Sequence, residues 1–278
     1  MAVLTMAGRC PLLDLANMPR SWSPTVIDLT DLVWITPFEV AGLAAIWTRL
    51  DTTERRPRVE LPREAEVKAY LVDIGLDRLI PGPWGAGGGS RIEPPWLPLT
   101  RISASEEWDD LLTVLHPALA DLLREPRLTQ LTMDMMSELV DNAATHGHSG
   151  TGTFVCAQLY TGATSGLSPG IWIGIADGGI GVPDHLRRNP KYRDISDDRD
   201  LIRLARQPWV TGTTDRRGWG LVQVFEDATE AGPTRLVIRS GRAQGEFTLR
   251  LGQRLTARYR RVNPLVPGTW IHIRVETA

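Results

Sequence analysis

The chain has 278 residues, of which 42% are hydrophobic, and its formal net charge at pH 7 is -2. This near-neutral charge gives no global electrostatic reason for nucleic-acid binding, and no apolar run approaches the length of a membrane span. The start lacks the pattern of a signal peptide, and two cysteines, Cys10 and Cys156, make no disulfide framework. We therefore expect a cytoplasmic protein of two domains, with no nucleic-acid or membrane partner.

After an N-terminal segment at residues 1–24, residues 25–80 alternate between strand and helix patterns. The expected elements are strands at 26–29, 32–35 and 58–62 and helices at 37–50 and around 67–76. At the start of the first helix, Thr36 is a good cap, Pro37 suits the first helical position and Glu39 completes a capping-box signal. The pattern predicts an α/β module.

This alternation resembles a STAS domain, the fold of anti-sigma-factor antagonists. The chain departs from that family at the strand-to-helix turn, where Ile35-Thr36-Pro37 replaces the usual Asp-Ser phosphoacceptor. Thr36 offers a hydroxyl that a kinase could use, but helix capping is the favoured role of this residue. Regulation through a phosphorylated STAS serine is therefore not expected.

Residues 81–104 separate this module from the rest of the chain. They include the run Pro81-Gly82-Pro83-Trp84-Gly85-Ala86-Gly87-Gly88-Gly89-Ser90 and the pair Pro94-Pro95. Glycine and proline at this density cannot build a core, so the segment is predicted to be a linker. No Lys-Ser or Lys-Thr follows the glycines, as a phosphate-binding loop would require. The second domain is expected at residues 105–278.

The first motif of the second domain lies on a predicted helix. Apolar residues recur at helical spacing from Leu128 to Ala143, and the helix is expected to end near Gly147. Glu138 and Asn142 are four residues apart and so share one face. Asn142 can give an oxygen to Mg²⁺, while Glu138 can polarise a water or hydroxyl.

The second motif follows an apolar run at residues 170–176, which predicts a buried strand. Asp177 at the end of this strand is an acceptor suited to the exocyclic amine of adenine. Gly179 and Gly181 follow, and they allow the backbone to pass close to a ligand. Asp followed by glycines is on its own only a turn signal.

The third motif is a loop from Thr211 to Gly220 that runs into an apolar helical pattern. Gly218 and Gly220 would expose backbone amides at the N-terminus of this helix, where the dipole favours phosphate. The residues that we expect to bind the nucleotide here are Thr213, Thr214, Gly218, Gly220 and Leu221.

The three motifs, in this order, resemble the N, G1 and G2 boxes of the GHKL superfamily, which includes gyrase, chaperone ATPases, histidine kinases and mismatch-repair ATPases. The resemblance covers about residues 105–276 and implies an α/β sandwich with helices on one face of a mixed sheet. It implies ATP and Mg²⁺ as cofactors, with Glu138 as catalytic base, Asn142 as magnesium ligand and Asp177 as adenine reader. Gly179, Gly181, Gly218 and Gly220 would then be hinges of an ATP lid between residues 183 and 217.

The remaining sequence argues against two branches of that superfamily. The only histidine ahead of the first motif, His116, precedes Pro117, which disfavours helical geometry at the histidine, so histidine autophosphorylation is not expected. The chain ends soon after the closing strand at residues 267–275, where gyrase and mismatch-repair proteins continue into a transducer domain.

We therefore expect an ATP-binding regulatory protein that uses Mg-ATP binding and slow hydrolysis to switch contacts with a protein partner. The alternative is a serine/threonine kinase, because the compact N box also resembles that of anti-sigma-factor kinases. A third possibility is a nucleotide-sensing scaffold without turnover. The sequence leaves the partner and the oligomeric state open.

Overall fold

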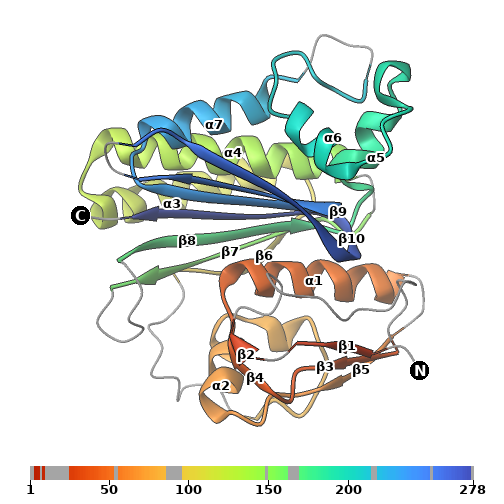
Figure 1. The fold of residues 1–278 in the computed structure, drawn as a ribbon. Helices are drawn as coiled ribbons and strands as arrows, with labels where there is room; N and C mark the ends of the chain where they lie inside the picture. The colour runs from red at the N-terminus through yellow and green to blue at the C-terminus, as the bar shows by residue number, and fades with distance from the viewer. Residues whose placement is uncertain are drawn as a thin grey trace.

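A computed structural model describes residues 3–6, 8–9, 25–52, 56–85, 96–147, 150–161, 169–213, 218–250 and 253–276. Its elements stack in three layers (Figure 1). These are an N-terminal layer of short parallel strands with their helices, a five-stranded sheet and an outer layer of helices. Within the described residues, no helix combines the length and apolar character that crossing a membrane requires.

The N-terminal layer confirms the elements predicted between residues 25 and 80. Its bounds are β3 Val26–Asp28, β4 Leu32–Trp34, α1 Pro37–Thr52, β5 Arg58–Glu60, α2 Ala65–Asp73 and the 3-10 turn η2 Leu76–Arg78. The layer also takes β1 (Val3–Thr5) and β2 (Gly8–Arg9) from the segment predicted to precede the module. β1 pairs with β3, β3 with β5 and β2 with β4, all in parallel. β1 and β2 were not predicted from the sequence.

The capping-box signal at the start of α1 is confirmed in its acidic half. Glu39 accepts a hydrogen bond from the backbone N–H of Thr36 at 2.9 Å and another from the Thr36 hydroxyl. Thr36 is only 3% exposed, and its hydroxyl is already engaged. In this fold the Thr36 hydroxyl is buried and bonded to Glu39, so it is not presented to a protein kinase.

The buried Glu39 carboxyl leads to a prediction for the pH dependence of stability. Burial raises its pKa from 4.5 to about 7, against the lowering effect of the Thr36 hydrogen bonds. Its stabilising contribution is therefore complete below pH 4.5 and is lost as the pH rises through about 7. The neutral variant Glu39→Gln should gain about 3 kcal/mol relative to wild type between pH 4.5 and 8.

Urea unfolding of wild type and Glu39→Gln at intervals between pH 4.5 and 8 measures this difference. Glu64→Gln, a change at an exposed glutamate beside α2, is the matched control. Parallel stability curves for wild type and Glu39→Gln would contradict the prediction.

The large sheet has the strand order β6-β7-β8-β10-β9. Its strands are β6 Leu97–Ile102, β7 Thr153–Tyr160, β8 Gly170–Asp177, β9 Thr234–Leu249 and β10 Thr256–Glu276. Every pairing in it is antiparallel, so the expectation of a mixed sheet is wrong. The β7–β8 and β9–β10 pairs are each consecutive in the chain, and neighbours of this kind pair antiparallel without a long crossover. The expected linker at 81–104 is also too long, because it contains the edge strand β6 and the buried Trp84.

Helices cover both faces of this sheet, not one face as expected (Figure 1). α3 (Ser105–Leu123), α4 (Pro126–Gly147) and α7 (Gly220–Glu230) lie on one side, and α1 lies on the other. α3 continues through Pro117, so His116 is helical and exposed. The expectation that Pro117 disfavours helical geometry at His116 is therefore wrong.

Each face of the sheet has its own hydrophobic core. On the α4 side, buried residues include Met135, Leu139, Ile173 and Ile271. On the α1 side, one cluster joins the N-terminal layer to the sheet; it includes Leu4, Ile27, Phe38, Leu71, Phe154, Cys156 and Trp270. The two parts of the chain therefore share a core through α1.

The expected lid segment is folded over most of its length. It forms α5 (Gly181–Arg187), the 3-10 turn η3 (Pro190–Tyr192) and α6 (Asp198–Leu204). Leu186, Tyr192, Leu201 and Ala205 make a small core of their own.

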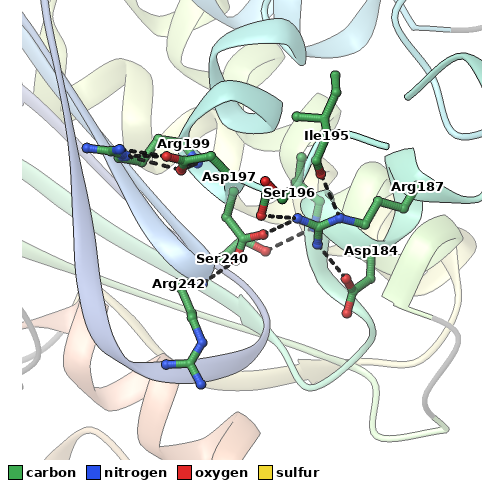
Figure 2. A network of polar contacts seen from close by, with 10 residues as sticks. Asp184, Arg187, Ile195, Ser196, Asp197, Arg199, Ser240 and Arg242 are labelled. Carbon is green, nitrogen blue, oxygen red and sulfur yellow. Dashed lines mark hydrogen bonds and ion pairs between the residues drawn. The ribbon is translucent and has the colours of Figure 1, made fainter. Parts of the chain in front are cut away.

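A polar network ties this segment to the large sheet (Figure 2). Arg187 donates to Asp184, to Asp198 and to the carbonyls of Ile195 and Ser196. Asp198 also accepts the backbone N–H of Arg242 in β9 at 2.7 Å. Asp198 thus links the segment to β9.

Candidate functional site

The three motifs meet at one cavity of about 400 Å³ between α4, α5 and the start of α7. Residues from all three line it: Glu138, Asn142, Asp177, Gly181, Gly218, Gly220 and Leu221. They come from segments up to about 80 residues apart, so only the tertiary fold brings them together. The cavity is large enough for a small organic ligand.

α4 supplies a carboxylate and an amide to this cavity. Glu138 is partly buried, and burial, followed by the charges of Asp141 and Asp227, raises the pKa of its carboxyl. A carboxylate with a raised pKa is a better proton acceptor near neutral pH. Within the described residues, Nδ2 of Asn142 is buried and has no hydrogen-bond partner. The Asn142 amide therefore has bonding capacity left for a ligand.

The start of α7 faces these two side chains. A Cβ placed on Gly220 would lie 2.5 Å from Oε2 of Glu138 and 3.0 Å from the Asn142 amide nitrogen. Glycine at this position lets the start of α7 lie directly against the Glu138 and Asn142 side chains. No side chain caps the N-terminus of α7, whose first backbone N–H groups lack helical partners. Such an end favours an anion.

Gly218 has a backbone reason to be glycine. Its φ is +108°, and a Cβ there would lie 2.6 Å from the carbonyl oxygen of Val210. An L-residue would be strained at this position and would also collide with the chain. Gly218 accepts the backbone N–H of Trp209 at 3.2 Å, which closes the base of the loop.

Asp177 forms the opposite wall of the cavity and is only 3% exposed. Its Oδ1 accepts the N–H of Gly179 at 2.7 Å, and its Oδ2 accepts the N–H of Thr269 at 3.0 Å. Burial raises the pKa of this carboxyl to about 6, although the two N–H donors and the charge of Arg49 lower it. Each oxygen keeps a lone pair for a further donor.

Not every predicted site residue lines the cavity. Gly179 instead shapes the turn after β8, since its carbonyl accepts the N–H of Gly268 at 2.9 Å. Thr213 does not line the cavity itself, but its hydroxyl lies 3.2 Å from the hydroxyl of Thr211, which does. Thr214 lies outside the described residues.

The cavity also includes residues that the sequence motifs did not single out. His185 is one turn after Gly181 on α5, and Thr269 follows Gly268 in the closing strand. Trp219, which is 50% exposed, stacks on Trp209 with ring centroids 5.3 Å apart. The helical spacing from Gly181 could have pointed to His185, but nothing in the sequence singles out the tryptophan pair.

The described residues contain no group of three or more His, Cys, Asp and Glu side chains arranged to hold a metal. Magnesium does not need such a group, because it commonly binds through one or two protein oxygens, waters and the phosphates of its ligand. Asn142 lines the cavity beside the anion-favouring end of α7, and its amide oxygen is of the ligand type that magnesium takes. Its buried Nδ2 group is a donor and is suited to an acceptor atom of the ligand.

No protein-family model matches this chain, and searches of curated proteins and of solved structures also found no match.

Proposed function

We propose that this chain binds Mg-ATP in the cavity and uses binding and slow hydrolysis to change its contacts with a partner protein. The observation that supports this most strongly is the convergence of Glu138, Asn142, Asp177 and the uncapped start of α7 on one cavity. A hydrogen-bond acceptor for a base and an anion-favouring helix end are the two features that a nucleotide needs.

Each wall of the cavity has a role in this proposal. Asp177 accepts the exocyclic amine of adenine with a lone pair that the backbone leaves free. The first amides of α7 receive phosphate oxygens, and Asn142 would hold the magnesium ion through its amide oxygen. Bound magnesium would neutralise phosphate charge and make the terminal phosphorus a better electrophile. Glu138 takes a proton from the attacking water.

Calorimetric titration of the chain with ATP, with and without magnesium, tests the proposal directly. Free phosphate is followed on the same samples. Binding with phosphate release supports the hydrolytic switch. Binding without release would overturn the hydrolysis step and direct attention to transfer onto a protein hydroxyl. Absence of binding would overturn the whole proposal.

Replacing the base acceptor should weaken ATP binding sharply. In Asp177→Asn, the new NH₂ group must face the N–H of Gly179 or that of Thr269, both of which are donors. We expect ATP affinity to fall about 30- to 100-fold, which corresponds to a loss of about 2 to 3 kcal/mol. The exposed Asp194→Asn, outside this cavity, is the control and should bind as wild type does. Equal ATP binding by Asp177→Asn and wild type would exclude Asp177 as the base reader.

A further inference from the structure

Helix α1 of the N-terminal layer contacts the turn that follows β8, next to Asp177 of the cavity lining. A Cβ on Gly178 would lie 3.2 Å from the carbonyl oxygen of Ala45 and 3.4 Å from Cβ of Arg49. The turn therefore lies close to the second half of α1, against the backbone of Ala45 and the Cβ of Arg49. Figure 1 shows α1 lying along the large sheet on the face away from α4.

Arg49 makes the polar part of this contact. Its Nη1 donates to the carbonyl of Gly178 and, at 3.1 Å, to the carbonyl of Gly179. The same Gly179 donates its N–H to Asp177 and accepts the N–H of Gly268. The Arg49 guanidinium thus binds two carbonyls of the same turn whose Gly179 N–H positions the Asp177 carboxylate.

We propose that Arg49 is a positioning residue through which the N-terminal layer sets the nucleotide affinity of the cavity. The inference rests on the proposed function, because it takes the cavity to bind ATP. Arg49 does not line the cavity, so it acts through the turn and not on the ligand. Any change in the N-terminal layer that displaces α1 from the sheet would remove the guanidinium from this turn.

The charge of Arg49 supports the same role. It lowers the pKa of the Asp177 carboxyl, which burial holds at about 6, and so favours the ionised acceptor. The other titratable groups that line the cavity are Glu138 and Asp141 of α4 and His185 of α5. Without Arg49, the pKa of Asp177 should be higher, so the carboxyl should ionise only at a higher pH. As the pH is lowered, ATP affinity should therefore begin to fall at a higher pH than in wild type.

The first test needs no nucleotide. Hydrogen exchange of the full chain without ATP is compared for wild type, Arg49→Met and Arg49→Lys in the peptide that contains Gly179 and in the one that contains Gly268. Both amides are hydrogen-bonded in the turn, so Arg49→Met should exchange faster at both, and Arg49→Lys should restore part of the protection. Arg58→Met, which removes a solvent-exposed ion pair with Glu60, is the control and should leave both peptides unchanged.

The second test measures ATP affinity by calorimetry between pH 5.5 and 8. Arg49→Met should bind ATP about 10-fold more weakly near pH 6 and should approach wild type at higher pH, whereas Arg58→Met should follow wild type throughout. A pH-independent loss would contradict the charge argument and leave only the geometric one.

The outcomes separate this inference from the proposed function. If wild type binds ATP but neither exchange nor affinity responds to Arg49→Met, the positioning role is excluded and the ATP site stands. If wild type binds no ATP, the proposed function fails and the affinity claim fails with it. Faster exchange in Arg49→Met would then support only the mechanical link between α1 and the turn.

Discussion

Replacing Glu138 by glutamine should lower ATP turnover by about 10²- to 10⁴-fold, the range that a positioned general base contributes. Glutamine has nearly the same size as glutamate and still fits beside Gly220. It cannot accept a proton from water. ATP affinity should therefore remain close to that of wild type while phosphate release slows by this factor.

The matched control for this change is Asp134→Asn, one turn earlier on α4 and outside the cavity lining. It removes a carboxylate from the same helix, and its turnover should stay within a few-fold of wild type. Single-turnover phosphate release, together with calorimetry, measures both variants. Turnover in wild type should also rise with pH through the raised pKa of Glu138, because the base acts when ionised. Unchanged turnover in Glu138→Gln would show that a group other than Glu138 accepts the proton of the attacking water.

Replacing Gly174 by alanine should destabilise the protein by about 4 kcal/mol or more, which is large against a total of about 5 to 15 kcal/mol. A Cβ at this position in β8 would overlap the carbonyl group of Pro37 and crowd the N–H of Phe38, which are backbone atoms of the first turn of α1. Backbone atoms cannot turn away as a side-chain end can. The helix would have to lift off the sheet and open the core around Phe38 and Trp270.

Gly232→Ala is the control for this second prediction. Gly232 has a φ of +92° and no atom within 4 Å of a Cβ built on it, so alanine adds backbone strain without a collision. It should cost about 1 to 2 kcal/mol. Urea unfolding gives both values. Equal losses for the two variants would show that α1 does not lie on β8 as closely as described.

Local sequence patterns were sufficient for several elements of this protein. The apolar spacing from Leu128 to Ala143 predicted α4 with its end at Gly147, and the run before Asp177 predicted β8. The capping residues predicted the first residue of α1. These features depend on contacts within a few residues, so the chain itself carries their signal.

Sheet direction and the covering of its faces were not predictable in the same way. β10 lies between β8 and β9 although it follows both in the chain, and α1 covers the sheet from about a hundred residues upstream. Apolar strands read alike in parallel and antiparallel sheets, and a family resemblance suggested the wrong arrangement. The helical Pro117 shows a similar limit, since tertiary packing overrode a local preference.

The candidate site was likewise predictable from the sequence only in part. The sequence by itself determined the identity and order of its chemical groups, because Glu138 and Asn142 share a helix face and the glycines mark turns. Only the tertiary structure decided that these groups face one cavity, that Gly179 and Thr213 stand behind it, and that His185 and Trp219 belong to its walls. The physical reason is that local patterns specify the direction of a side chain from its own element, whereas convergence depends on how distant elements pack to bury their apolar faces.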